Sequence, residues 1–341
     1  MMNENNIQKN LIVFLLLTGL FSGCTSEDGQ KANEQSLEKI VLMTDWYPQA
    51  EHGGFYQALA KGFYEEEGLD VEIRSGANLQ DIRPIVALGQ VDFAIGTTDT
   101  TIIGIGRGVP LVGMFPYFQR DPQCIMFHPN NDIETLYDLK DREVMLQASL
   151  SYTEYMVKSL GITMNLIPVD YSIARFATDE NFIQQCFVTS EPVHLRKQGI
   201  ETEVIMLSES GFSPYRHIYT SKATLGNKRE EAAAFTRASI KGWYDFMYSD
   251  PQPGMDLIYK ENPQQSEEKM LKSIAEMKKY NIFSGDISNG DVAGLYDAAR
   301  LQNEVDQLNA LGSLDFPVAM EDSFDLGLIK PSEIDALQVQ E

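Results

Sequence analysis

A regular alternation of short apolar segments with longer amphipathic ones constrains the fold of this chain most. KIVLM (39–43) and LDVEI (69–73) have the composition of strands, and GFYQALAKGFYEEEG (54–68) between them predicts a helix that ends at a glycine. The alternation of predicted strands and helices continues, with VDFAIG (91–96) and VPLVGMF (109–115) as the next two strands. Strands that alternate with helices in this way predict an α/β fold, in which helices cover a largely parallel sheet.

The middle and the end of the chain differ in character. A second alternating series runs from QCIMFHP (123–129) to EVIML (203–207), and it is long enough to form a lobe of its own. From Lys228 onward the pattern predicts long helices, over 229–250 and 266–281, without a convincing strand. We expect this helical tail to pack back on a neighbouring lobe.

The N-terminal segment predicts export. Lys9 precedes the apolar run LIVFLLLTGLFS (11–22), which has the layout of a secretory signal and is shorter than the ~20 apolar residues of a membrane-spanning helix. LFSGC (20–24) is similar to the bacterial lipoprotein cleavage box, although Phe21 holds the place where a leucine is usual. We expect residues 1–23 to be a signal peptide, Cys24 to carry a lipid that anchors the exported chain to the bacterial membrane, and residues 24–37 to form a flexible tether. The alternative is an ordinary cleaved signal.

Composition excludes several classes of protein. The formal net charge of -23 argues against nucleic acid or an anionic lipid surface as the partner, because both bind basic patches. Besides Cys24, the chain contains Cys124 and Cys186, which either form one disulfide or stay unpaired. The histidines lack metal-ligand spacing, and no nucleotide-binding or hydrolase motif is present, so we expect neither a metal nor a cofactor.

The segment DWYPQAEHGGFYQALAKGFYEEEGLDVEI (45–73) resembles the opening of the thiamine-precursor (pyrimidine synthase-like) family of substrate-binding proteins, relatives of the sulfonate, nitrate and taurine binders of ABC transporters. Further segments agree with that family in order and spacing: GQVDFAIGTTDT (89–100), GVPLVGMFPYFQRDPQCIMFHP (108–129), LYDLKDREV (136–144), SEPVHLRKQGI (190–200) and AFTRASIKGWYDFMYSDP (234–251).

This resemblance implies a two-lobed periplasmic-binding-protein fold of type II, in which each lobe is a mostly parallel sheet flanked by helices. Residues 38–120 plus 220–341 would form lobe 1, and residues 121–219 would form lobe 2. A small-molecule ligand would lie between the lobes, which close by a hinge motion. ABC permease and ATPase subunits would then receive the ligand, while the lipid anchor would hold the chain at the membrane.

Ligands of doubly wound sheets lie beyond the carboxyl ends of the strands, where helix N-termini offer N–H groups and partial positive charge. Trp46 and Tyr47 directly follow the first predicted strand, and Trp46 either stacks on a flat ligand or fills the core. His52 and Thr98 each contact ligand or only cap a helix. Glu191 corresponds to a glutamate that reaches the cleft in the resembling family; the alternative is a plain first-turn acid. The candidate ligand-binding residues are Trp46, Tyr47, His52, Gly53, Gly96, Thr97, Thr98, Tyr117, Glu191 and Tyr215.

The resembling family also contains enzymes that make the thiamine pyrimidine from pyridoxal phosphate and a histidine of their own chain. The positions of their lysine and histidine correspond here to Gly96 and Thr100, and GFSPYRHIYTS (211–221) lacks the cysteines of their second motif. We therefore expect a binder of a small planar heterocycle and no enzyme. The alternatives are a binder of a sulfonate or nitrate, for which Arg120, Arg175 and Arg216 offer cations, and a sensor module without a role in transport.

Overall fold

The structure is a computed structural model, and it describes residues 36–337. The predicted signal peptide, Cys24 and most of the predicted tether lie outside the described residues. The described residues belong to one compact unit. Across residues 36–337, no helix is both long enough and apolar enough to cross a membrane.

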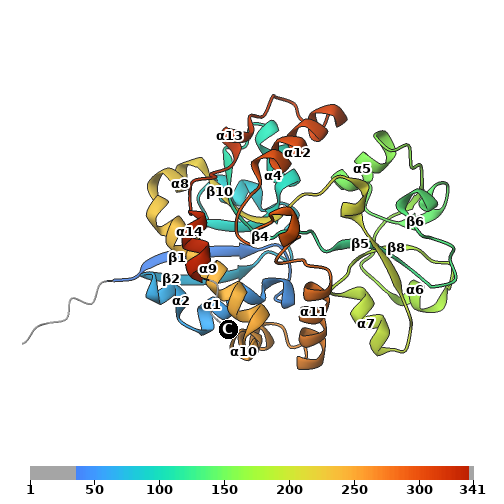
Figure 1. Cartoon of the computed structure of the whole chain (residues 1–341), viewed down its shortest axis with the longest axis horizontal. Coiled ribbons are helices and arrows are strands. Elements are labelled where there is room, and N and C mark those ends of the chain that lie inside the picture. The colour runs from blue at the N-terminus through green and yellow to red at the C-terminus, as the bar shows by residue number, and fades with distance from the viewer. Residues whose placement is uncertain (1–35, 338–341) are drawn as a thin grey trace, which may run out of the picture. The chain divides into compact units, whose positions relative to one another are not determined.

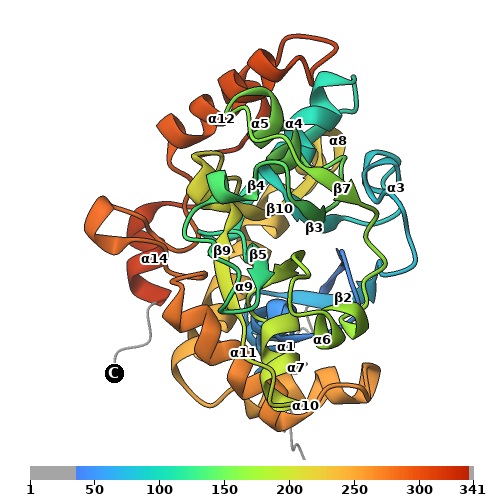
Figure 2. The ribbon, with the colours of Figure 1, turned by 90° about the vertical axis from the view of Figure 1, so that its right-hand side faces the viewer.

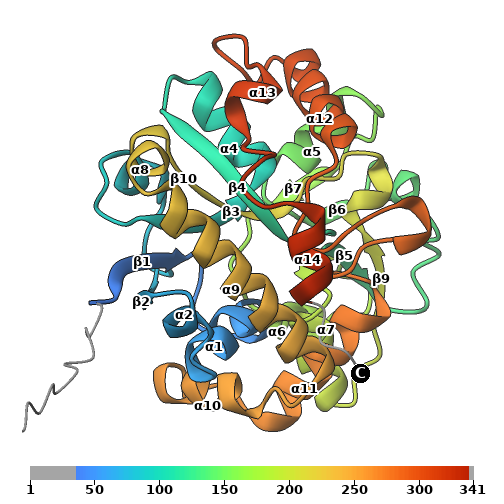
Figure 3. The ribbon, with the colours of Figure 1, turned by 60° about the vertical axis from the view of Figure 1, so that its left-hand side comes forward.

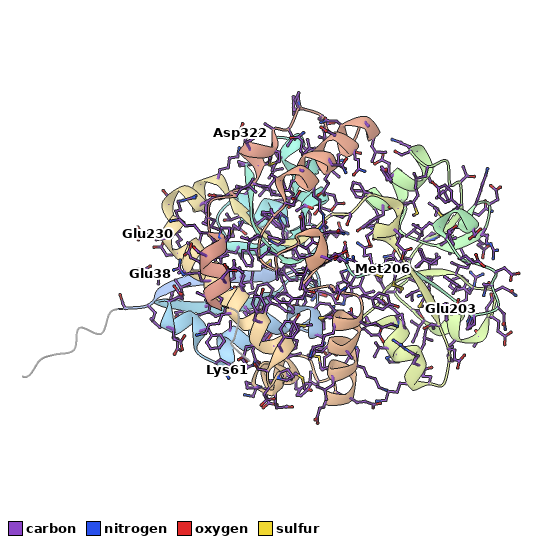
Figure 4. All side chains as sticks on the ribbon, in the orientation of Figure 1. Glu38, Lys61, Glu203, Met206, Glu230 and Asp322 are labelled. Atoms are coloured by element: carbon purple, nitrogen blue, oxygen red, sulfur yellow. A yellow bond between two sulfur atoms is a disulfide. The ribbon has the colours of Figure 1, made fainter. Side chains whose placement is uncertain are left out.

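The first of two five-stranded sheets has the order β2-β1-β3-β10-β4. Its strands β1, β2 and β3 run parallel, whereas β10 runs antiparallel between β3 and β4. Figure 1 shows this sheet on the left, and Glu38 marks the start of β1 in Figure 4. The strands are β1 (Glu38–Thr44), β2 (Leu69–Ser75), β3 (Phe93–Thr97), β4 (Leu111–Phe118) and β10 (Arg216–Ser221).

The second five-stranded sheet repeats this topology with the order β7-β6-β8-β5-β9. Its strands β6, β7 and β8 are parallel, and β5 runs antiparallel between β8 and β9. Glu203 and Met206 mark the edge strand β9 on the right of Figure 4. Each sheet is therefore mostly parallel, as expected, with one antiparallel strand that makes it mixed. The strands are β5 (Gln123–Phe127), β6 (Glu143–Met145), β7 (Asn165–Ile167), β8 (Gln184–Phe187) and β9 (Glu203–Met206).

Helices cover both sheets, as the alternating pattern predicts. The predicted helix over 54–68 is divided at Gly62, whose φ of +74° belongs to the left-handed region that favours glycine. The helices that follow strands of the first sheet are α1 (Gly53–Ala60), α2 (Phe63–Glu66), α3 (Arg83–Ala87), α4 (Thr98–Gly106) and α8 (Lys222–Asn227). Those that follow strands of the second sheet are α5 (Ser151–Lys158), α6 (Ala174–Thr178) and α7 (Glu191–Lys197), and the short 3-10 turns are η1 (Ala50–His52), η2 (Leu136–Leu139), η3 (Leu207–Ser210) and η4 (Ile287–Asn289).

The C-terminal part is helical, as predicted from Lys228 onward. The long helix α9 packs against α1 and carries α14 beside it (Figure 3). Gly53 and Gly54 permit this contact, because a Cβ on Gly53 would lie 2.2 Å from Phe246 and one on Gly54 would lie 2.2 Å from Trp243. The helices are α9 (Arg229–Tyr248), α10 (Gln252–Glu261), α11 (Glu267–Lys279), α12 (Ala298–Leu311), α13 (Met320–Ser323) and α14 (Pro331–Leu337).

The chain passes between the sheets twice, after β4 and after β9. The lobe boundaries remain a prediction, because the described residues form one compact unit. Strand β10 belongs to the first sheet, so the expected boundary between residues 219 and 220 passes through a strand. We propose that this boundary lies before Arg216 instead.

Cys124 on β5 and Cys186 on β8 form a disulfide, which resolves the alternative that the sequence left open. The two residues are direct partners in the register of these antiparallel strands. The neighbouring partners in the same register are Gln123 and Phe187. The disulfide therefore connects the first strand after the crossing to the strand that ends at Phe187.

Candidate functional site

Aromatic residues from both sheets meet where the strands end. Trp46 follows β1, and its ring centroid lies 5.5 Å from that of Tyr171, which follows β7. Tyr47 lies edge-on to Trp46 at 5.6 Å. Trp46 is 39% exposed and Tyr171 is 67% exposed, so neither residue belongs to the core. This geometry leaves the stacking interpretation of Trp46 open and excludes the core-packing one.

Four residues form a bonded group that we call the Arg216 cluster (Asp45, His52, Tyr117 and Arg216); Asp45 is half-buried and the other three are buried. One carboxylate oxygen of Asp45 lies 3.1 Å from His52 Nε2, and the other accepts a hydrogen bond from Arg216 Nη2. Arg216 Nε donates to the Tyr117 hydroxyl at 2.9 Å. Although burial opposes it, the charges of Arg216 and His52 hold the pKa of Asp45 well below its usual range.

The Arg216 cluster also contacts the second sheet. The guanidinium of Arg216 lies over the ring of Phe187, 5.4 Å from its centroid. Asp121, in the first crossing, accepts hydrogen bonds from the backbone N–H of Gln123 at 3.1 Å and from its side-chain amide at 3.3 Å. Burial raises the pKa of Asp121 to about 6, although the positive charge of Arg216 opposes that shift. The charge of Arg216 therefore acts on Asp121 in the first crossing, and its guanidinium contacts Phe187 of the second sheet.

Three further polar atoms in this region are buried and have no hydrogen-bond partner among the described residues. They are Asp99 Oδ1, Gln123 Oε1 and the Tyr152 hydroxyl. Their side chains are 5%, 8% and 1% exposed. We call them the unpaired set. Leaving a buried polar group unpaired costs about 1–3 kcal/mol of stability. A ligand that forms a hydrogen bond with one of these atoms would recover that free energy.

The unpaired set comes from different parts of the fold. Asp99 lies in the first turn of α4, Gln123 begins β5 and Tyr152 lies in the first turn of α5. Burial raises the pKa of Tyr152, and the charges of Asp121 and Asp99 raise it further. Asp99 also contributes to the raised pKa of Asp121. These groups are therefore within electrostatic reach of one another, and acceptors outnumber donors among them.

Several predicted ligand residues are already engaged in bonds within the protein. The hydroxyl of Thr98 donates to Glu304 at 2.8 and 2.9 Å and accepts from the Tyr215 N–H at 2.9 Å. Tyr215 is fully buried, with Arg300 over its ring at 3.6 Å and its hydroxyl accepting from the Asp297 N–H at 3.0 Å. Tyr117 packs against Trp243. These contacts account for the three residues Thr98, Tyr215 and Tyr117 without a ligand.

Local packing also accounts for other candidates. Gly53 serves the contact with Phe246, and a Cβ on Gly96 would lie 2.9 Å from Tyr219. Thr97 is the N-cap residue of α4, and its hydroxyl lies 3.0 Å from that of Thr100. Glu191 accepts a hydrogen bond from the Phe187 N–H at 2.8 Å, and burial raises its pKa. Of the predicted set, His52 and Tyr117 belong to the Arg216 cluster, and Trp46 and Tyr47 directly follow its Asp45; a ligand contact for each is still a proposal.

Two sheets of identical topology, with two crossings and polar residues gathered at the facing strand ends, define a periplasmic-binding-protein fold. Residues 49–253 match the family described as NMT1/THI5 like, and the chain belongs to it. This confirms the resemblance that the sequence motifs indicate.

Individual relatives agree with this assignment. The chain is 24% identical to the formylaminopyrimidine-binding protein of Halalkalibacterium halodurans, over 92% of this chain and 97% of that protein. It is 20% identical to the riboflavin-binding protein RibY of Chloroflexus aurantiacus, over 85% of this chain and 86% of that protein. A solved structure of a putative sulfonate-binding protein SsuA from Methylobacillus flagellatus has a TM-score of 0.63 at 14% identity, covering 89% of this chain and 96% of the other.

Proposed function

We propose that the chain is an extracytoplasmic solute-binding protein of an ABC importer. It binds a small planar heterocycle that is rich in N–H donors, of the formylaminopyrimidine kind, between its two sheets. The observation that carries this proposal is the unpaired set: Asp99 Oδ1 and Gln123 Oε1 are buried acceptors without a partner among the described residues. An aminopyrimidine supplies the donors that such acceptors require.

The charge of the site favours this ligand over a sulfonate or nitrate. An anion would enter among the carboxyl groups of Asp45, Asp99 and Asp121. Arg216 is already bonded to Asp45 and Tyr117, and Arg175 pairs at the surface with Glu143 at 2.8 Å. Neither of these two guanidiniums is thus uncommitted, and the third candidate, Arg120, lines a separate cavity that also contains the carboxyl groups of Asp286 and Asp291.

The site also favours binding over pyrimidine synthesis. A lysine at the position of Gly96 would meet Tyr219, because even its Cβ would lie 2.9 Å from that ring. Position 100 is a threonine whose hydroxyl donates to the Thr97 carbonyl at 2.9 Å. These residues do not supply the nucleophile and the histidine that the synthases of the resembling family use.

The proposal includes export of the chain and its attachment to the membrane by a lipid. The disulfide between Cys124 and Cys186 supports an exported protein, because disulfides persist in oxidising compartments. A lipid on Cys24 would hold the chain at the outer face of the membrane. There it would deliver the ligand to the permease, and the ATPase subunits would drive its import. A sensor without a role in transport is the second candidate, and a neighbouring permease gene would argue against it.

The ligand class is tested by calorimetric titration with formylaminopyrimidine, riboflavin, taurine and nitrate. Replacing Asp99 by asparagine exchanges one buried acceptor oxygen for an N–H donor, and we expect affinity for formylaminopyrimidine to fall about ten- to a hundredfold. Asp70→Asn, on the exposed side of β2, is the matched control and should leave affinity unchanged. Unchanged affinity in Asp99→Asn, or tighter binding of taurine or nitrate than of the pyrimidine, would contradict the proposal.

The role of Trp46 is tested by Trp46→Ala. Loss of a stacking contact and its buried area should weaken formylaminopyrimidine binding roughly tenfold. The melting temperature of the ligand-free protein should hardly change, because Trp46 is 39% exposed. Tyr137→Ala, which removes a 61% exposed ring elsewhere, is the control for affinity. A large fall in ligand-free stability with unchanged affinity would refute the stacking role.

A further inference from the structure

Helix α11 contacts elements that follow strands of both sheets. It packs against η1, which follows β1 of the first sheet, and against α7, which follows β8 of the second. Figure 2 shows α11 beside α7. The loop that precedes η1 carries the predicted ligand residues Trp46 and Tyr47, and α7 begins at Glu191, which is also one of the predicted set. A helix in this position is able to act on both elements at once.

A buried chain of hydrogen bonds joins these three elements. The Ser273 hydroxyl of α11 donates to the backbone carbonyl of Thr189 at 2.6 Å, closer than its 3.0 Å contact with Lys269 O in its own helix. The hydroxyl of Thr189 donates in turn to the carboxylate of Glu51. All three residues, Ser273, Thr189 and Glu51, are at least nine-tenths buried. Thr189 is thus held by one bond to η1 and by another to α11.

The outer part of the same contact is ionic and loosely packed. Arg196 on α7 pairs with Glu276 on α11 at 2.8 Å, and Lys197 pairs with Glu268 at 3.0 Å. Two cavities of about 510 and 370 Å³ open along this contact, and both are lined by residues of α7 and α11. Leu195 of α7 and Met277 of α11 belong to one hydrophobic core cluster, so the ion pairs form the more exposed part of this contact. Ion pairs at such a surface are weak and screened by salt.

We propose that α11 latches the binding site: Ser273 is a positioning residue that holds Thr189 against Glu51 and thereby slows ligand release, and the α7–α11 ion pairs make this hold depend on salt. This inference rests on the proposed binding function. Ser273 does not touch the ligand. It acts through Thr189, whose loop leads from β8 into α7.

The kinetic test measures association and dissociation of formylaminopyrimidine by stopped flow. Ser273→Ala should raise the dissociation rate about fivefold, which corresponds to one hydrogen bond, and leave the association rate within about twofold. Ser273→Thr retains the hydroxyl and should keep the wild-type rates. Ser239→Ala is the matched control, because Ser239 is also fully buried but bonds the Tyr64 hydroxyl on α2. Equal dissociation rates in Ser273→Ala and Ser239→Ala would overturn the latch.

The salt dependence tests the ion pairs separately. Raising NaCl from roughly 0.02 to about 0.5 M screens surface charges and should speed dissociation from the wild type. The double variant Arg196→Gln, Lys197→Gln should dissociate several-fold faster at low salt and lose most of this salt response. Lys241→Gln, which removes a surface pair with Glu66 at 2.6 Å, should behave as the wild type. A salt response that the double variant retains in full would count against the latch.

Hydrogen exchange of the ligand-free protein separates this inference from the proposed function. Removing the Ser273 hydroxyl should raise exchange at the backbone amides of residues 188–191 about fivefold, whereas Ser239→Ala should not. If the wild type fails to bind formylaminopyrimidine but the exchange difference is found, the ligand assignment is wrong and the positioning role of Ser273 stands. If exchange in this loop is equal in the two variants, the positioning role is wrong whatever the ligand is.

Discussion

Replacing Arg216 by alanine should lower the free energy of unfolding by about 3–5 kcal/mol, as expected when one partner of a buried ion pair is removed. Arg216 is 4% exposed and bonds both Asp45 and the Tyr117 hydroxyl. Without the guanidinium, the half-buried Asp45 carboxylate loses its main counter-charge. Urea denaturation at neutral pH measures the change, because the slope of the transition also reports whether the variant still unfolds as one unit.

Two further variants make this expectation specific. Arg74→Ala removes a pair at the surface, where Arg74 is 44% and Glu72 is 59% exposed, and it should cost no more than about 1 kcal/mol. The double variant Asp45→Asn, Arg216→Met removes both charges and should recover part of the stability that Arg216→Ala loses. A loss below about 1 kcal/mol in Arg216→Ala would show that the Arg216 cluster is not a stabilising network.

The same residues explain why β10 was not predicted. Its sequence RHIYTS begins with Arg216 and His217, so it lacks the continuous apolar pattern of a buried strand. In the structure both side chains are buried because they are bonded: Arg216 to Asp45 and Tyr117, and His217 to the hydroxyls of Thr101 at 2.8 Å and Tyr296 at 2.7 Å. Their bonding partners are distant in the sequence, and these bonds make the two polar residues compatible with the interior. A local sequence pattern does not contain information about such distant partners.

The predicted ligand residues lie at or near strand ends, and the structure shows which of them are engaged in bonds within the protein; a ligand contact for each stays a prediction. Trp46 lies at a strand end and is exposed, as a ligand residue requires. Thr98 has the residue type and position expected of a ligand contact, yet its hydroxyl is bonded to Glu304. Asp99 and Tyr152 were not among the predicted ligand residues, because polar residues in a first helical turn look like ordinary helix starts. Burial without a partner distinguishes them, and burial is a property of the folded chain alone.

The disulfide between Cys124 and Cys186 should contribute about 2–4 kcal/mol to stability. The two cysteines are 62 residues apart in the sequence, and closing a loop of that length in the unfolded chain removes conformational entropy. The bridge also fixes β5 to β8 where Gln123 lies opposite Phe187, so it supports both the unpaired set and the Arg216 cluster.

Comparing oxidised and reduced wild-type protein isolates the covalent bond, because both states keep the same atoms except for two hydrogens. Denaturation with excess reductant should show the 2–4 kcal/mol loss, once mass spectrometry verifies that the thiols are free. Cys124→Ala, Cys186→Ala should lose about 1–2 kcal/mol more, because both sulfurs are buried and their removal leaves a cavity. Formylaminopyrimidine should bind the reduced protein more weakly, since Gln123 and Phe187 are then less firmly held. An unfolding midpoint that is unaffected by verified reduction would show that strand pairing alone fixes this part of the site.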